Sequence, residues 1–168
     1  MANKLEIIKY PDPLLNKLSL AVENFDKELH QFLDDMALTM YEANGIGLAA
    51  PQVAVLKRIT VIDVSEDAPE LREFINPQII ASDGSTASEE GCLSIPDYRD
   101  IVKRNTEITV KAQDRFGKAF EVQATGLLAI CLQHEIDHLD GILFVDRLSR
   151  LKREMFKRWL KKQAETSE

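Results

Sequence analysis

The sequence has little of what marks a membrane-bound or exported protein. No apolar run approaches the roughly 18 residues that a transmembrane helix needs. The first residues, MANKLEIIKYPD, lack the apolar core of a secretory signal peptide. Only two cysteines are present, Cys92 and Cys131. Without an export signal we expect both to be reduced thiols, in a cytoplasmic protein that does not associate with membranes.

The 168 residues also lack internal repeats, low-complexity segments and linkers rich in Pro, Gly or Ser. A chain of this length can build one well-filled core but is short for two. With 45% hydrophobic and 29% charged residues, the composition is that of an ordinary globular protein. We therefore expect one domain over residues 1–168. A monomer is expected because no sustained heptad pattern is present.

Positive charge is scarce except near the C-terminus. The net charge is −7, yet residues 147–162 contain eight Lys or Arg and one acidic residue, Glu154. We expect a basic C-terminal helix and tail over residues 147–168. This asymmetry has two interpretations: docking on a polyanion, or a solvated amphipathic helix packed on the body through Leu151, Met155 and Trp159.

Several short segments between residues 46 and 124 are strand candidates. The first three are IGLAA, ITVIDV from Ile59 and FINPQII from Phe74. EITVKA and FEVQA alternate apolar with polar residues, as half-buried strands do. The segment QDRFGK, which contains Gly117, is expected to join these two into a hairpin.

Apolar residues at helical spacing predict helices before and after these strands. The first follows Asp26, a plausible N-cap, and stops at Asn44-Gly45. A second begins at Thr125-Gly126 and ends at Gly141, and a third follows Ser149. The order helix, antiparallel strands, helix, helix predicts an α+β fold.

The second of these helices carries the sequence QHEIDHLDG, which contains the H-E-x-x-H pattern of metal hydrolases. His134 and His138 are one turn apart and project to one side, so both imidazoles can hold one ion. Glu135 lies about 100° around the helix, where it can exchange a proton without ligating. The alternative is a pair of core histidines satisfied by hydrogen bonds. Because residues 127–132 are apolar, we expect this helix to be central and buried.

A catalytic metal centre of this kind needs a third protein ligand and an open position for water. The longer metzincin pattern fails because its last position is Phe144, which cannot ligate. Glu154 is the candidate if the protein is a peptidase of the thermolysin kind. It lies in the basic segment, however, where pairing with Lys157 or Arg158 is the simpler explanation.

Three further residues are of a type that could supply the third ligand. His30 lies on the first predicted helix and is expected to be solvated. Cys131 is about 10 Å from His138 along the helix axis, so a buried hydrophobic role suits it better. Cys92 follows Gly91 in EEGCLSIP, where CLSI is expected to be a short extended piece. Cys92 is then either the third ligand or a structural thiol.

Three motifs stand together in this chain: GIGLAAPQ (Gly45–Gln52), EGCLSIP (Glu90–Pro96) and QHEIDHLDG (Gln133–Gly141). In this order and at these separations they resemble bacterial peptide deformylase, and the likeness covers nearly the whole chain. The resemblance implies antiparallel β-sheets packed around a central metal-binding helix, with an N-terminal and a C-terminal helix. It also implies the following roles: Cys92, His134 and His138 as metal ligands, Glu135 as general acid/base, and the Gln52 side chain and Leu93 N–H as donors to the oxyanion.

The implied reaction is hydrolytic removal of the formyl group from the N-terminal formylmethionine of newly synthesised polypeptides, by a metal-bound water. The implied cofactor is Fe²⁺, with Ni²⁺, Co²⁺ or Zn²⁺ able to substitute. The residue pattern itself would suit zinc equally well.

The resemblance also implies a substrate pocket and a partner. The pocket for the methionine side chain would be lined by Gly45, Ile46, Leu127, Ile130, Cys131 and His134. Arg99 would contact the substrate backbone. Plain core packing is the alternative for Leu127 and Ile130, and a solvated charge is the alternative for Arg99. The basic C-terminal helix would dock on ribosomal RNA, close to the emerging formylated chain.

Two functions of other kinds stand as alternatives. One is a zinc metallopeptidase that cleaves internal peptide bonds, with Glu154 as third ligand and Cys92 dispensable. The other is a non-catalytic, metal-stabilised module that binds RNA through the basic helix and has no use for Glu135. An open three-ligand site with both Gln52 and Glu135 beside it argues against this second alternative.

Overall fold

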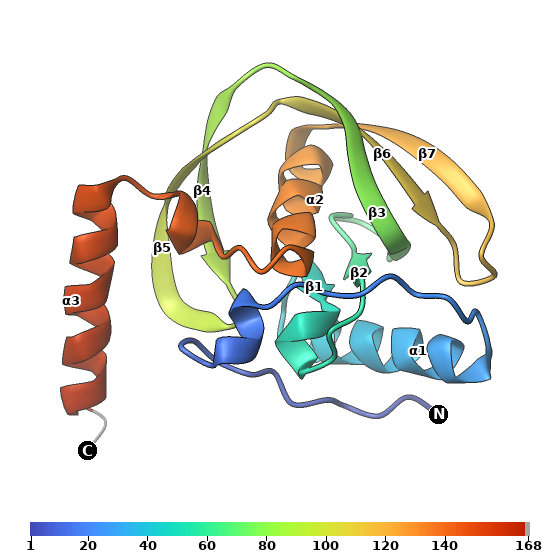
Figure 1. The fold of residues 1–168 in the computed structure, drawn as a ribbon, viewed down its shortest axis with the longest axis horizontal. Coiled ribbons are helices and arrows are strands. Elements are labelled where there is room, and N and C mark those ends of the chain that lie inside the picture. Colours follow the sequence, from blue (N-terminus) through green and yellow to red (C-terminus); the bar gives the residue numbers. More distant parts are fainter. Residues whose placement is uncertain (167–168) are drawn as a thin grey trace.

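The computed structural model describes residues 1–166, which form two antiparallel sheets and three α-helices (Figure 1). The helices are α1 (Lys27–Glu42), α2 (Gly126–Leu139) and α3 (Arg150–Thr166), with 3-10 turns η1 (Pro13–Asn16), η2 (Ala50–Val53) and η3 (Phe144–Arg147). The strands are β1 (Gly47–Ala49), β2 (Ile59–Ile62), β3 (Arg72–Asp83), β4 (Thr86–Cys92), β5 (Ile95–Arg104), β6 (Glu107–Gln113) and β7 (Ala119–Thr125). The last two residues of the expected tail lie outside the described part. Within residues 1–166, no helix is both long and apolar enough to cross a membrane.

The larger sheet has the strand order β1-β2-β3-β6-β7, with every neighbouring pair antiparallel. The predicted hairpin is confirmed: β6 and β7 pair with Val110 opposite Val122. Gly117 lies in their turn with a φ of 84°, a left-handed conformation that glycine adopts without strain. This sheet forms one wall around the central helix.

Local capping and apolar spacing account for α1. The Asp26 carboxylate accepts a hydrogen bond from the Leu29 N–H at 3.0 Å, as an N-cap does. The apolar face buries Leu33, Met36 and Met40 completely against β1 and β2. This helix therefore packs against β1, the strand that carries the GIGLAA motif.

The helix α2 is central, as expected. All of its residues from Cys131 to Leu139 are buried, including the polar ones. Figure 1 shows it between the five-stranded sheet and the two-stranded β4–β5 sheet. The expected α+β architecture around a central helix is confirmed.

The β4–β5 hairpin was not predicted, and the expectation that CLSI is extended is wrong at its centre. Cys92 ends β4, Leu93 and Ser94 form the turn, and Ile95 begins β5. The strands of this hairpin carry charged residues such as Glu89, Glu90 and Arg99 at positions where a half-buried strand has apolar residues, so no alternating pattern predicts them. The hairpin forms through pairing between β4 and β5, with only two residues at the turn.

The face through which α3 packs agrees with the expectation at Trp159 but not at Leu151 and Met155. Phe156 is the buried residue, at 2% exposure, whereas Leu151 and Met155 are 72% and 55% exposed. The rings of Phe156 and Trp159 lie 4.7 and 4.8 Å from that of Tyr98 on β5. Aromatic contacts with the hairpin therefore set the orientation of this helix.

Candidate active site

Cys92, His134 and His138 come together although they lie on two separate elements. Their donor atoms all lie within 4.8 Å of one another. The Cys92 Sγ is 3.4 Å from the His138 Nε2. In the described chain no other group of three or more His, Cys, Asp or Glu residues has this geometry. The expected ligand candidates are thus juxtaposed.

The chemistry of these donors fits a divalent transition-metal ion. One thiol sulfur and two imidazole nitrogens are ligands that zinc, iron, cobalt and nickel accept. The Nδ1 of His134 is hydrogen-bonded to Glu90 at 3.0 Å, which leaves its Nε2 for an ion. Burial, together with the neighbouring His134 and Arg104, lowers the pKa of His138 well below its usual value.

Glu135 lies on the same helix and lines the cleft beside this group. Its side chain is 4% exposed, and its Oε1 has no hydrogen-bond partner within residues 1–166. Burial raises the pKa of this carboxyl to about 7, with a further contribution from Glu90 that opposes the effect of His134. A carboxyl group with a pKa near neutrality can both accept and return a proton.

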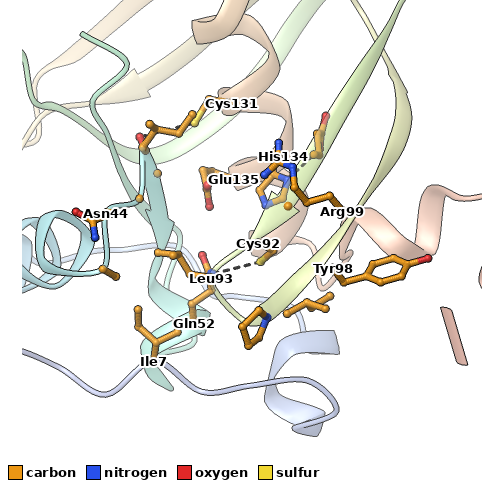
Figure 2. A pocket seen from close by; sticks show the side chains of 18 of the residues that line it. Ile7, Asn44, Gln52, Cys92, Leu93, Tyr98, Arg99, Cys131, His134 and Glu135 are labelled. Atoms are coloured by element: carbon orange, nitrogen blue, oxygen red, sulfur yellow. Dashed lines mark hydrogen bonds and ion pairs between the residues drawn. The ribbon is translucent and has the colours of Figure 1, made fainter. Parts of the chain in front are cut away.

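Gln52 and Leu93 lie next to Cys92, and the three are seen together in Figure 2. The Oε1 of Gln52 accepts the Ala49 N–H at 2.9 Å, which fixes the orientation of the buried amide. Its Nε2 therefore points to the Ser94 Oγ at 3.2 Å and the Cys92 Sγ at 3.5 Å. Leu93 lies in the turn between β4 and β5.

Of these groups, all but His138 line a cleft of about 820 Å³. All the residues expected around the methionine pocket line it: Gly45, Ile46, Leu127, Ile130, Cys131 and His134. Arg99 lines it as well, with its guanidinium 3.2 Å from the backbone oxygen of Glu89. Leu127 is 52% exposed, so it does not belong to the packed core.

The N-terminal segment also contributes to this cleft, which was not predicted from the sequence. Ile7 and Lys9 line it, and the Lys9 Nζ donates to the Leu93 backbone oxygen at 3.2 Å. The segment is held by backbone hydrogen bonds from Ile8 to Gln52, at 2.8 Å, and from Tyr10 to Ser94, at 2.8 Å. No local pattern could reveal this, because the partners are more than 40 residues away.

Cys131, His30 and Glu154 are not members of the candidate metal group. Cys131 is 5% exposed and packs in a hydrophobic cluster, as expected. The prediction that His30 is solvated is wrong: its Nε2 is 2.8 Å from the Arg115 carbonyl oxygen, and its ring packs edge-on against Phe116. Glu154 lies exposed on α3 and pairs with Lys157 at 3.8 Å, so the metallopeptidase alternative finds no support.

Comparison with known proteins gives a consistent result. The profile of the Polypeptide deformylase family matches residues 4–154. A peptide deformylase of Chromobacterium violaceum is 55% identical over 158 residues, covering 94% of this chain and 95% of the relative.

Among solved structures, a peptide deformylase from Legionella pneumophila superposes with a TM-score of 0.91 at 50% identity, covering 98% of both chains. The Met-Ala-Ser-bound class I type b peptide deformylase from Acinetobacter baumannii superposes with a TM-score of 0.84 at 34% identity, covering 88% of this chain and all of that one. The sequence match, the shared fold and the juxtaposed Cys92, His134 and His138 agree, and the chain belongs to the polypeptide deformylase family.

Proposed function

We propose that this protein hydrolyses the formyl group from the N-terminal formylmethionine of newly synthesised polypeptides and releases formate. The observation that carries the proposal is the convergence of a Cys/His/His group, Glu135 and Gln52 on one cleft. Residues 1–168 would act as a single domain.

Cys92, His134 and His138 would hold a divalent metal ion through one Sγ and two Nε2 atoms. When bound, the ion supplies Lewis acidity, which lowers the pKa of water at this position. We propose Fe²⁺ as the ion in the cell, with Ni²⁺, Co²⁺ or Zn²⁺ as substitutes. The donor set supports a transition metal, and the resemblance to the bacterial enzymes supports iron.

Glu135 would act as the general acid/base. Its carboxylate accepts the proton of the attacking water, and it later donates that proton to the departing amine of the methionine. A pKa of about 7 supports both transfers at neutral pH.

Gln52 and Leu93 would stabilise the negative charge that develops on the formyl oxygen. The amide Nε2–H of Gln52 and the backbone N–H of Leu93 both donate to it. Because the Ala49 N–H holds the Gln52 amide in orientation, this donor needs no reorganisation during the reaction. Loss of one such donor typically costs about 10²–10³ in kcat.

The cleft would bind the methionine side chain through Gly45, Ile46, Leu127, Ile130, Cys131 and His134. Arg99 would bind the peptide backbone beyond it. The related Acinetobacter protein binds Met-Ala-Ser, which supports a cleft of this kind for a peptide that begins with methionine. One methylene more or less in an apolar pocket changes binding by only about 1–3 kcal/mol, so norleucine should be accepted.

The test is formate release from formyl-Met-Ala-Ser by anaerobically purified, iron-loaded protein, beside a Glu135→Ala variant. We expect rapid release by the native protein and a loss of activity in the variant, with the metal content unchanged. No formate from native protein that carries one metal per chain would overturn the assignment.

We further propose that α3 docks on ribosomal RNA in the cytoplasm and that the protein is a monomer. Arg153, Arg158 and Lys161 are exposed on α3, and Leu151 and Met155 lie exposed among the basic residues. Binding to purified ribosomes should weaken steeply with salt and fall in an Arg153→Glu/Lys161→Glu variant. Formate release from the free peptide should be unchanged in that variant. Equal ribosome binding by both proteins at every salt concentration would contradict the docking proposal.

A further inference from the structure

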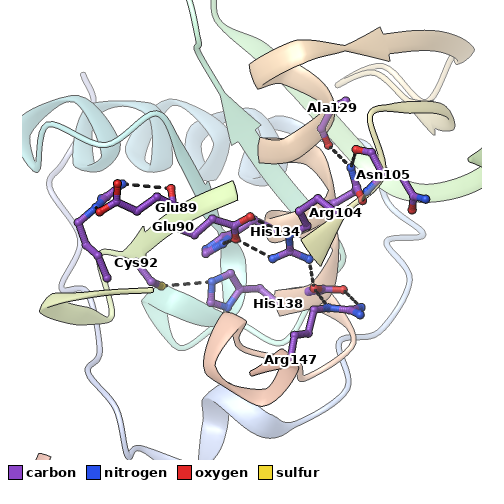
Figure 3. A network of polar contacts seen from close by, with 12 residues as sticks. Glu89, Glu90, Cys92, Arg104, Asn105, Ala129, His134, His138 and Arg147 are labelled. Carbon is purple, nitrogen blue, oxygen red and sulfur yellow. Dashed lines mark hydrogen bonds and ion pairs between the residues drawn. The ribbon is translucent and has the colours of Figure 1, made fainter. Parts of the chain in front are cut away.

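Four charged side chains form a continuous chain of ion pairs that no step of the proposed mechanism uses (Figure 3). Arg104, at the end of β5, lies at its centre with 4% of the residue exposed. Its Nε and Nη2 donate to the two carboxylate oxygens of Glu90 at 2.8 and 2.7 Å. Its Nη1 donates to the Asp137 Oδ2 at 2.7 Å. Arg147 completes the chain, donating to both oxygens of Asp137 at 2.6 and 2.7 Å.

The two carboxylates that Arg104 joins belong to the two elements that carry the candidate metal ligands. Glu90 lies on β4 two residues before Cys92, and its Oε1 accepts a hydrogen bond from the His134 Nδ1 at 3.0 Å. Asp137 lies on α2 between His134 and His138. A single guanidinium therefore connects the strand of the thiol ligand to the helix of both imidazole ligands.

The charged groups of this cluster are joined by hydrogen bonds and are not only near one another. Glu90 accepts three hydrogen bonds, two from Arg104 and one from His134, and the Arg104 guanidinium donates to Glu90 and to Asp137 at the same time. Only arginine can do this, because the lysine ammonium is a point charge without a planar fork.

We infer that Arg104 is a positioning residue for the metal centre, holding the β4–β5 hairpin and α2 at the separation at which Cys92, His134 and His138 reach one ion. The inference rests on the ligand set of the proposed function. It assigns to Arg104 no contact with substrate or metal. It predicts that the geometry of the guanidinium, and not only its charge, sets the affinity for the ion.

The test is Arg104→Lys, which keeps the charge and removes the fork. Co²⁺ affinity is measured by competition with a chelator, and the thiolate-to-cobalt absorption band reports whether Cys92 ligates. We expect the affinity to fall about 10- to 100-fold, as when partners of metal ligands are lost elsewhere, and the band to weaken or shift.

Arg115→Lys is the matched control. Arg115 makes an equivalent fork with Glu73, at 2.9 and 2.6 Å, and also binds Asp34 at 3.0 Å, away from the metal group. We expect this variant to lose stability but to keep the native Co²⁺ affinity and absorption band. A similar fall in affinity in both variants would show a general effect of destabilisation and would overturn the inference.

Arg147→Lys is the second variant, in case Arg104→Lys does not fold, because the Arg147 side chain is 44% exposed. It should lower Co²⁺ affinity in the same direction but by less. Native affinity and an unchanged band in folded Arg104→Lys, or in Arg147→Lys if Arg104→Lys does not fold, would refute the positioning role. These readouts need no substrate, so failure of native protein to release formate would reject the proposed function separately.

Discussion

At the scale of single residues, the absence of a side chain at Gly47 makes room for the Glu135 carboxylate. A Cβ at Gly47 would lie 2.5 Å from the Glu135 Oε2 and 2.8 Å from the Cys131 Sγ. Contacts this short are not tolerated, so one of these atoms would have to move. The Glu135 side chain can therefore keep its position only because residue 47, on β1, is a glycine.

For this reason Gly47→Ala should displace Glu135 and lower kcat. A misplacement of about 1 Å can cost about 10²-fold in rate, and we expect a loss of that order. Steady-state formate release at saturating formyl-Met-Ala-Ser measures it, and metal content should stay at one ion per chain.

The double variant Gly47→Ala/Glu135→Ala provides the control. If the glycine acts only through the carboxylate, the double variant should be no slower than Glu135→Ala alone, because the two effects are not additive. Full additivity would show that Gly47 acts in another way, for example through the Cys131 wall of the cleft.

At the scale of elements, α3 is attached to the body mainly by one cluster of aromatic rings. Phe156 is buried beside Tyr98 and Tyr10, with ring centroids 4.7 and 5.3 Å away. Lys152 adds an ion pair to Asp100 at 3.3 Å. The rest of the helix surface is mostly basic and exposed, so the docked position depends on few residues.

Phe156→Ala should therefore undock α3 from the hairpin. Truncation of a buried phenylalanine costs about 3–5 kcal/mol, and in a terminal helix this loss is expected as local opening. Trypsin, which cuts after Lys and Arg, should cleave within residues 150–162 much faster than in the native protein. Leu151→Ala, at a 72% exposed position, should be cleaved at the native rate. Equal cleavage of the two variants would contradict the packing described above.

At the scale of the whole molecule, metal binding would couple two parts of the fold that are far apart in sequence. Cys92 closes the β4–β5 hairpin, and His134 and His138 lie on the central helix. Removal of the ion with a chelator should therefore lower the Tm. An ion at a free concentration of 100 times its Kd stabilises the folded state by about 2.7 kcal/mol. Thermal unfolding with Co²⁺ and with excess chelator measures this, and the difference should vanish in Cys92→Ala.

The pH dependence of stability should depend in part on a carboxylate that does not line the cleft, that of Asp63. Asp63 accepts hydrogen bonds from the Ser65 hydroxyl, from Tyr41 at 2.6 Å, and from the backbone of Ser65 and Glu70. Led by the Ser65 and Tyr41 bonds, these lower its pKa to about 2. Because the folded state holds the charged form more strongly than the unfolded chain, this stabilisation is complete above about pH 4 and is lost as the pH falls toward 2.

Asp63→Asn should accordingly reduce the free energy of unfolding by about 1–2 kcal/mol at pH 6. The difference from the native protein should shrink between about pH 4 and pH 2. Urea unfolding at several pH values between 6 and 3 measures the difference. A difference that stays constant over this range would show that Asp63 contributes through packing rather than through its charge.

Several features of this protein were readable from the sequence because they depend on neighbours a few residues apart. The Asp26 cap, the stop at Asn44-Gly45 and the β6–β7 hairpin are local, and each is confirmed. The spacing of His134 and His138 placed both rings on one side of a buried helix because helical geometry repeats at that interval. The three motifs, taken together, were also specific enough to indicate the family.

Other features arise only from contacts between distant segments, and only the tertiary structure decided them. Residue spacing left Cys92 as either ligand or structural thiol, because it lies 46 residues from His138 and the hairpin that brings it there has no apolar alternation. The buried face of α3 follows from Tyr98, more than 50 residues earlier. The ion pairs of Arg104 likewise join three elements. Sequence periodicity reports that an element has an apolar face, whereas which residues of that face are buried, and against what, depends on the packing of the whole chain.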